Sequence, residues 1–373
     1  MIITDISLRQ FRNYQDFSQS DLGNTVIFCG PNAVGKTNIL EAIHLLTATT
    51  SFRHAQISQL IMHGADHAHI QLNMSDSNRL LTTSLTLEPG KKRFQVNGKV
   101  KSASEVKGVL PAVTFVPDDL ELAKKSSSVK RMALDDLGVQ LSKNYDVVHR
   151  DYEKTLRYKN RLLKEEAPHA LIEAINETLV AVGSQLYCYR RSLYDRILPI
   201  VQKNYEAISQ SKERFDAEYL PSWLRMQSRF AGLTSFDDES SETLDRSQVK
   251  EYLYDALQAF GNEEIRARRA FVGPHNDQIT FFLSGNDAAS FASQGQQRSI
   301  VLAWKLAEVQ MVRLMLHVDP VLLLDDVMSE LDESRRNLLV QAAGTDVQTF
   351  ITATDLSPFN PALLEKAHVI NLG

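Results

Sequence analysis

Apolar and polar residues alternate with a period of two through much of residues 1–116. This alternation places every second side chain on one face of the chain, so it predicts strands rather than helices. The predicted strands are Ile2–Ile3, Ile6–Leu8, Ile70–Met74, Leu80–Leu87, Arg93–Val96 and Val113–Val116. Arg93–Val96 leads directly into Asn97 and Gly98, a pair that favours a two-residue hairpin turn.

Between about residues 119 and 270 the apolar spacing changes to steps of three and four, which predicts helices. The longest stripe starts at Leu171 and ends at Ile197, and Pro199 lies near the predicted end of that helix. The other predicted elements here are the helices Tyr145–Glu166 and Gln248–Arg269 and a loop at Asp237–Glu242. We therefore expect a mainly helical insertion.

Short apolar strands return after Phe271 and alternate with helices. The strands are Ile279–Leu283, Val321–Leu324, Gln348–Thr352 and Val369–Leu372, and the helices are Ile300–Leu316, Glu333–Ala343 and Pro361–Lys366. Strands that alternate with helices predict a parallel sheet. We expect an α/β fold in which residues 1–118 and 271–373 form one head and residues 119–270 form a helical arm.

Composition narrows the class of protein. The chain has 373 residues, 43% hydrophobic and 23% charged, which is typical of a globular protein with two domains. Its 41 basic and 46 acidic residues give a net charge of −5, so nucleic-acid binding would need local basic patches. Cys29 and Cys188 lack a metal-binding spacing and fit a reducing cytoplasm. Asp5 argues against a signal peptide and the charges within 300–316 argue against a membrane span.

The strongest chemical motif lies between a predicted buried strand, Asn24–Cys29, and a predicted helix, Lys36–Thr47. It fits G-x-x-x-x-G-K-[ST] and reads Gly30-Pro31-Asn32-Ala33-Val34-Gly35-Lys36-Thr37. The glycines let consecutive backbone N–H groups face the β-phosphate of a nucleotide, and Lys36 places a cation on the β and γ oxygens. The Thr37 hydroxyl can bind Mg²⁺. The motif predicts a nucleotide site at a helix N-terminus.

A second motif, Val321–Asp326, is an apolar strand that ends in two carboxylates. Acidic residues often end strands, so this motif alone does not indicate a function. It indicates one only because a phosphate loop lies upstream. Together the two motifs predict Asp325 as the residue that holds Mg²⁺. Asp326 is predicted to be the catalytic base that orients or deprotonates the attacking water, with Lys36 as the catalytic cation.

A third motif, Ser293-Gln294-Gly295-Gln296, precedes the long apolar helix. Taken alone, it fits an ordinary helix N-cap. Its place upstream of Asp325 makes it resemble the S-G-G-Q-type signature of ATP-binding-cassette (ABC) ATPases, which completes the γ-phosphate site of the partner subunit. By the same resemblance, Asp332 belongs to a D-loop and Thr354 occupies the switch position, where most transporters carry His.

The whole chain resembles the RecF family of bacterial DNA-repair and recombination mediators, relatives of the Rad50 and SMC heads. The matching segments are Phe11–Tyr14, Gly30–Ile43, Ser51–Arg53, Val116–Leu122, Val272–His275, Phe291–Ser299 and Leu322–Asp332. The resemblance implies an ABC-type P-loop ATPase head with an inserted helical arm, and adds Arg12 and Asn38 to the expected ATP contacts.

The resemblance also implies a function in DNA repair, recombination and replication. It implies an ATP-driven homodimer that binds double-stranded DNA at gaps or junctions and promotes RecA loading with RecO and RecR. ATP hydrolysis would be slow, stimulated by DNA and used as a switch.

Three basic clusters are candidates for DNA contact, although a charged run is more often a solvated face. They are Lys91-Lys92-Arg93, then Lys124, Lys125, Lys130 and Arg131, then Arg266, Arg268 and Arg269. The first is preferred because it lies in the predicted head. The chain departs from the family pattern in two segments. Asn276-Asp277-Gln278 stands where Arg-Asp-Asp is usual, and residues 124–131 carry lysines where the family has arginines. Either change could alter a contact with DNA or with a partner.

Three other classes remain open. An ABC transporter's nucleotide-binding subunit has a shorter insertion than the 293 − 35 = 258 positions that separate Gly35 from Ser293 here. An SMC-like structural ATPase would need long arms with sustained heptads. A metabolic P-loop kinase would not need the motif at 293–298.

Overall fold

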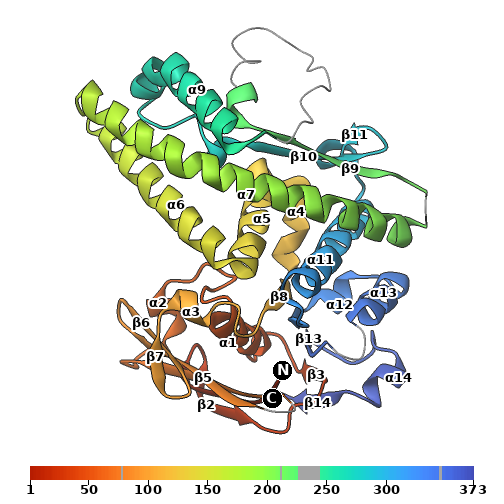
Figure 1. The fold of residues 1–373 in the computed structure, drawn as a ribbon. Coiled ribbons are helices and arrows are strands. Elements are labelled where there is room, and N and C mark those ends of the chain that lie inside the picture. Colours follow the sequence, from red (N-terminus) through yellow and green to blue (C-terminus); the bar gives the residue numbers. More distant parts are fainter. Residues whose placement is uncertain (77–78, 211, 226–243, 344–346) are drawn as a thin grey trace. The chain divides into compact units, whose positions relative to one another are not determined.

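The computed structural model describes residues 1–76, 79–210, 212–225, 244–343 and 347–373. The loop predicted at Asp237–Glu242 lies outside this part of the chain. By compactness the chain divides into unit 1, residues 1–120 and 301–373, and unit 2, residues 121–300 (Figure 1).

Unit 1 contains a five-stranded sheet in which every described pairing is parallel. Its strands, in spatial order, are β14 (His368–Asn371), β3 (Thr25–Cys29), β13 (Thr349–Ala353), β12 (Val321–Asp325) and β8 (Ala112–Phe115). The parallel sheet predicted from the strand–helix alternation is confirmed. It combines strands from both chain segments of unit 1, residues 1–120 and 301–373.

A second sheet of unit 1 is antiparallel and has six strands. In spatial order they are β2 (Tyr14–Gln19), β1 (Ile2–Phe11), β4 (Ala68–Ser75), β5 (Leu80–Glu88), β6 (Lys91–Val96) and β7 (Lys99–Lys101). Asn97 and Gly98 both have positive φ, 48° and 73°, in the turn between β6 and β7, which confirms the predicted hairpin.

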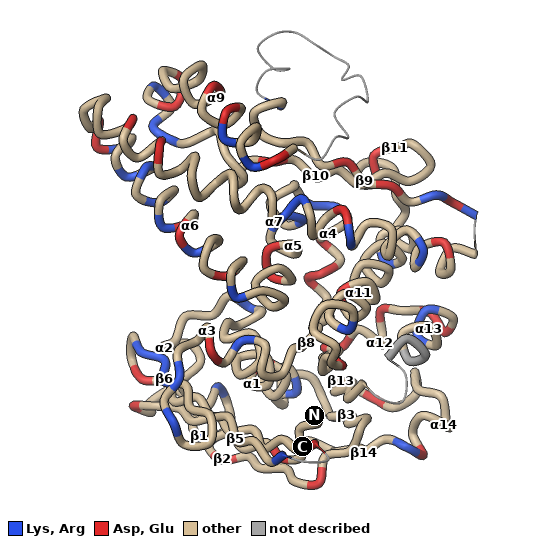
Figure 2. The backbone as a smooth tube through the Cα atoms, viewed as in Figure 1, with Lys and Arg blue, Asp and Glu red and all other residues tan. Residues whose placement is uncertain are grey.

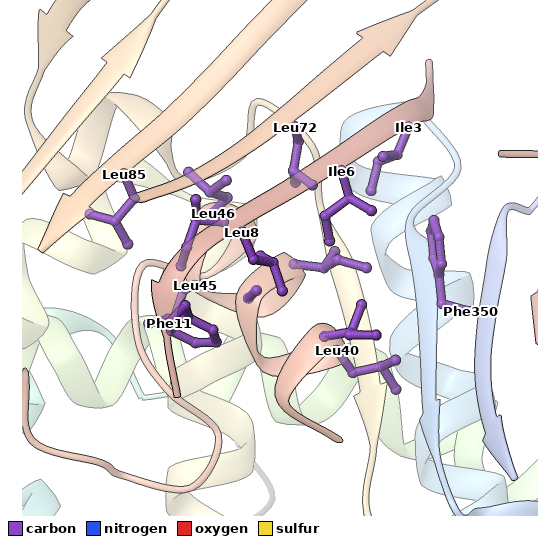
Figure 3. Packing of buried hydrophobic residues seen from close by; sticks show 14 of the residues in the cluster. Ile3, Ile6, Leu8, Phe11, Leu40, Leu45, Leu46, Leu72, Leu85 and Phe350 are labelled. Carbon is purple, nitrogen blue, oxygen red and sulfur yellow. The ribbon is translucent and has the colours of Figure 1, made fainter. Parts of the chain in front are cut away.

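Helix α1 (Lys36–Thr47) contacts both sheets, and the core of unit 1 forms around it. Figure 3 shows Ile6 and Leu8 of β1, Leu40 and Leu45 of α1, and Phe350 of β13 in one cluster of buried side chains. Each fully buried Leu, Ile or Phe contributes roughly 1.5–3 kcal/mol relative to exposure. This packing fixes the N-terminus of α1 beside the carboxyl ends of the parallel strands.

The remaining elements of unit 1 are helices, and one of them, α11, begins among the residues of unit 2. They are α2 (Ile57–Leu60), α3 (Ala103–Val106), η1 (Pro117–Leu120), α11 (Gln294–Leu316), α12 (Val327–Glu330), α13 (Glu333–Ala343) and α14 (Pro361–Leu364). Ile300, Val301 and Leu302 of α11 are fully buried, whereas Leu314 and Met315 near its end are exposed.

Unit 2 is mainly helical. Its helices are α4 (Glu121–Lys124), α5 (Ser127–Leu141), α6 (Lys143–Lys164), α7 (His169–Ser209), α9 (Arg246–Ala267), η3 (Pro274–Asn276) and α10 (Ala288–Phe291). Its sheet consists of β11 (Asn286–Asp287), β10 (Gln278–Leu283) and β9 (Phe215–Leu220). Because β10 pairs with β9, residues 271–300 pack within unit 2, whereas the sequence division assigned them to the head.

Helix α7 continues ten residues beyond Pro199, which the sequence placed near the helix end. Proline removes one backbone hydrogen bond from a helix interior and favours a break or kink. The apolar stripe nevertheless continues on both sides of it, because Leu193, Ile197, Val201 and Tyr205 are all buried at steps of four. Burial of this stripe holds the helix together across the proline.

A buried polar network joins the helices of unit 2 to the segment that follows Gly273. Arg190 donates two hydrogen bonds of 2.8 Å to the carboxylate of Asp135 and one of 2.6 Å to the carbonyl of Pro274. Asp277 is fully buried, lies 3.6 Å from the Arg190 guanidinium and accepts a hydrogen bond from Tyr219. Burial raises the pKa of Asp277, although Arg190 opposes the rise. Asp277, the position of this segment that matches the family pattern, therefore makes internal contacts.

We expect Arg190→Met to lower the free energy of unfolding by about 3–5 kcal/mol, because it removes the main cationic partner of two buried carboxylates. Arg191→Met is the matched control. Its guanidinium is about one quarter exposed and pairs with Asp195, so we expect a loss of about 1 kcal/mol or less. Urea unfolding followed by circular dichroism measures both, and equal losses would contradict the role given to Arg190.

Candidate nucleotide-binding site

The loop between β3 and α1 needs glycine at two positions for steric reasons. A Cβ atom on Gly30 would lie 2.2 Å from the carbonyl oxygen of Leu372, just after β14. Gly35 has a φ of 115°, and a Cβ there would lie 2.7 Å from the side chains of Asn13 and Tyr14. Only glycine fits both places without displacing the neighbouring chain.

The structure brings the first two motifs together. The Lys36 ammonium is nearly buried and donates hydrogen bonds to the carbonyls of Gly30 (2.7 Å) and Pro31 (2.9 Å), which holds it at the mouth of the loop. The Thr37 hydroxyl donates to Oδ1 of Asp325 at 2.8 Å. The phosphate loop and the end of β12 are therefore in direct contact.

Thr352 completes this contact from β13. Its hydroxyl donates to the same Oδ1 of Asp325 at 2.8 Å and accepts a 2.9 Å hydrogen bond from the backbone N–H of Asp326. Burial raises the pKa of Asp325, and the hydrogen bonds from Thr352 and Thr37 oppose that rise. A single carboxylate oxygen thus holds three elements, α1, β12 and β13, in register.

A cavity of about 260 Å³ opens beside these groups. Its lining residues are Asn32, Ala33, Gly35, Lys36, Thr37, Asn38, Arg53, Asp326 and Thr352. Asp326 is a non-glycine residue with a φ of 54° at the start of α12. Such left-handed conformations cost free energy and are concentrated at functional sites. Here the conformation places a half-buried carboxylate in the cavity wall.

Arg12, expected to contact ATP, makes other contacts in the structure. Its guanidinium donates hydrogen bonds to both oxygens of Glu41 (2.8 and 2.7 Å) and to the carbonyl of Gln59 (2.9 Å). Glu41 is fully buried, so it needs a cationic partner. Arg12 does not line the cavity, and its contact with ATP stays a prediction.

Two residues of the cavity were not among the predicted site residues. Nothing in the sequence marked Thr352 as a site residue apart from its place at the end of a predicted strand. Arg53 lies in the Ser51-Phe52-Arg53 segment that resembles the family, and its guanidinium donates to Oδ1 of Asn38 at 3.0 Å. Asn38 in turn donates to Asn13 at 2.7 Å. This chain of polar side chains braces the first turn of α1 against the turn between β1 and β2.

Residues 2–369 match the family described as RecF/RecN/SMC N terminal domain. The chain is 33% identical to DNA replication and repair protein RecF of Thermosynechococcus vestitus over 378 aligned positions, covering all of this chain and 96% of that protein. It is 32% identical to RecF of Halalkalibacterium halodurans, covering 99% and 97%.

The chain belongs to the RecF family.

Solved structures agree with this assignment. The recombination mediator protein RecF-ATPrS in the RecFOR pathway superposes with a TM-score of 0.85 at 29% identity, covering 96% of this chain and 94% of that one. The RecF-ATP structure gives a TM-score of 0.83. An SmcHead structure, at 13% identity and a TM-score of 0.54, shares the fold alone. The ABC-type ATPase head of RecF and SMC proteins is thus the fold of this chain.

The other site residues expected from the RecF-family resemblance lie at the starts of two helices and after the end of a strand. Ser293 and Gln296 form a reciprocal cap at the start of α11, with Gln296 accepting from the Ser293 N–H at 2.6 Å. Gln294 is exposed and Gly295 half-buried. Asp332 accepts from the N–H of Arg335 at 2.9 Å at the start of α13, and Thr354 is exposed after β13. The local geometry fits a cap, and the roles toward a second subunit stay predictions.

The basic cluster at 91–93 surrounds a second cavity, of about 400 Å³, on the outer strands of the antiparallel sheet. Lys91 and Arg93 are exposed. Lys92 donates a 3.1 Å hydrogen bond to the carbonyl of Thr49, and burial lowers its pKa. Lys92 therefore ties β6 to the segment after α1, although its side chain is exposed like those of Lys91 and Arg93.

Among the described residues, no helix is long and apolar enough to cross a membrane. Nor do three or more His, Cys, Asp or Glu side chains gather there in a group that could hold a metal ion.

We expect Lys36→Ala to weaken ATP binding about tenfold to hundredfold, because charge-assisted hydrogen bonds contribute roughly 1.5–3 kcal/mol. Isothermal titration calorimetry measures the affinity. Lys366→Ala is the control, since Lys366 is an exposed residue of unit 1 that does not line the cavity. An unchanged affinity in Lys36→Ala would contradict the assignment of the phosphate loop.

Proposed function

We propose that this protein is an ATP-dependent DNA-binding protein of recombinational DNA repair. In this proposal it forms a homodimer when it binds ATP and Mg²⁺, binds double-stranded DNA near single-strand gaps or junctions, and promotes RecA loading with RecO and RecR. Such partners place it in the cytoplasm. The observation that supports the proposal most is the Thr37–Asp325–Thr352 cluster beside Lys36, in a chain that aligns with RecF proteins over their length.

The residues fit ATP with Mg²⁺. The Thr37 hydroxyl and the Asp325 carboxylate are hard oxygen donors that already lie 2.8 Å apart. When bound, Mg²⁺ neutralises charge on the β and γ phosphates. The ammonium of Lys36 can exchange its two loop carbonyls for phosphate oxygens, which are stronger acceptors for a cation. Arg53 adds a second cation to the cavity wall and can bind a phosphate oxygen as well.

Asp326 is the best-placed base for hydrolysis. Its backbone N–H donates to the Thr352 hydroxyl. Its side chain lines the cavity, 3.4 Å from the Ser329 hydroxyl, and forms no ion pair with the described residues. A carboxylate in this place can accept a proton from a water that attacks the γ-phosphate. The adjacent Asp325 remains bonded to Thr37 and Thr352, so the two carboxylates have different roles.

We expect Asp326→Asn to bind ATP with near-normal affinity but to hydrolyse it about 10²–10⁴-fold more slowly, because the amide cannot accept the proton. Phosphate release under single-turnover conditions gives the rate. Asp355→Asn is the control, an exposed carboxylate just after β13 that bonds only within its own turn. Wild-type turnover by Asp326→Asn would remove Asp326 as the base.

The proposed dimer uses the start of α11. Ser293 is exposed beside a helix N-terminus, where backbone N–H groups favour an anion. In the proposed arrangement the γ-phosphate held by Lys36 of one subunit is met by Ser293 and Gly295 of the other. ATP then acts as part of the interface, and its hydrolysis releases the dimer.

We expect Ser293→Arg to bind ATP normally as a monomer but to lose ATP-driven dimerisation, because the large side chain fills the space that the partner's phosphate needs. Ser290→Arg, three residues upstream at an exposed position, is the control and should dimerise. Sedimentation velocity with ATP and Mg²⁺ distinguishes the two. A normal dimer from Ser293→Arg would refute the signature role. No dimer from the wild type would refute the proposed function itself.

A further inference from the structure

One face of α6 carries a continuous line of cations that no part of the proposed function uses. Seven exposed positions follow each other at alternating steps of four and three. They are Lys143, Val147, Arg150, Lys154, Arg157, Arg161 and Lys164. Six of the seven are Lys or Arg and none is acidic. Figure 2 shows Lys and Arg recurring along the length of this helix. We call these seven residues the α6 stripe.

Helix geometry makes the stripe straight and narrow. At 100° per residue its seven positions fall within roughly 100° of arc, and at 1.5 Å per residue it is about 31 Å long. The opposite face of α6 is buried in unit 2 through Tyr145, Val148, Tyr152 and Leu156. The stripe therefore presents its charges outward on a helix whose other face is held rigidly.

In the described part of the chain, acidic residues pair with two of the six cations of the stripe. Asp146 is buried and pairs with Arg150 at 3.3 Å, and Glu153 lies 3.9 Å from Arg157. Within the described part of the chain, Lys143, Lys154 and Lys164 form no ion pair. A solvated helix face normally mixes charges of both signs at a spacing of four, which stabilises the helix. The stripe keeps two pairs of this kind, and its lysines at 143, 154 and 164 form none within the described residues. This excess of positive charge can bind an external anion.

We propose that the α6 stripe binds the phosphate backbone of double-stranded DNA. This inference rests on the proposed function, which supplies DNA as the partner but gives no role to α6. The length of the stripe, about 31 Å, is close to one helical turn of B-DNA, about 34 Å. A line of cations without a pocket for a base edge contacts phosphates and so binds without sequence preference.

The stripe fits a duplex better than a single strand. A duplex is stiff over about 150 base pairs, so its phosphates can meet a straight line of cations without being ordered first. Single-strand sites combine a basic groove with exposed aromatic rings on which bases stack. On the exposed face of α6 the aromatic residue is Tyr158, and the guanidinium of Arg161 lies over its ring, 4.9 Å from the centroid. That ring face is already covered.

The test is a triple variant of the full chain, Lys154→Gln, Arg161→Gln and Lys164→Gln. The control is Lys203→Gln, Lys250→Gln and Lys366→Gln, which removes the same charge from three exposed sites outside α6. Affinity for a duplex is measured by fluorescence anisotropy against salt, with ATP and Mg²⁺ present. Each lost phosphate contact lowers the slope of log K against log salt by about 0.9. We expect a fall of up to about 2.7 per subunit for the stripe variant and none for the control.

Single Lys154→Gln should lower the slope by about 0.9, which guards against a folding defect in the triple variant. ATP affinity should stay at the wild-type value in every variant. If the stripe variant binds duplex DNA with wild-type affinity and salt slope, the inference is overturned and the proposed function still stands. The same result is expected if the stripe binds an acidic protein instead of DNA. A wild-type protein that binds no duplex overturns the proposed function as well.

Discussion

The parallel pairing of β3 with β13, and of β13 with β12, is the constraint on which the nucleotide site depends. This pairing sets Thr352 opposite Asp325 and brings Gly30 within hydrogen-bonding distance of Ala353. Residues separated by about three hundred positions in the chain thereby share one sheet edge. Because the carboxyl ends of parallel strands lie on the same side, the phosphate loop, the carboxylates and the switch position need no further device to bring them together.

Asp325 shows how this edge is prepared for a cation. Two hydroxyl groups donate to one of its oxygens, yet burial still raises its pKa. Neutral donors offset only part of the cost of removing a carboxylate from water. A divalent cation interacts with such a carboxylate more strongly than a hydroxyl can. The same geometry that holds the strands in register therefore favours a metal bound to phosphate oxygens beside Thr37.

The sequence was enough to predict the loop around Lys36, the strand ending at Asp325 and the parallel sheet, because each depends on local patterns of glycine, charge and apolar residues. The pairing of Arg12 with Glu41 could not be predicted, since it depends on the burial of an acid on α1. The continuation of α7 past Pro199 was missed for a related reason: tertiary packing outweighs a local helix breaker. Thr352 gave no signal, because any threonine at a strand end looks alike before the neighbouring strand is known.

The order of strands in the parallel sheet also determines when the head can be assembled during translation. β3 lies between β14 and β13, so both of its neighbours come from residues 349–371. Residues 121–300 form a contiguous unit that can fold earlier on the ribosome, while the apolar strand Val26-Ile27-Phe28 still has two open edges. Chains that stop short of β14 cannot place Leu372 against Gly30. The sheet edge that carries the phosphate loop is thus completed only after residues 349–371 have been translated.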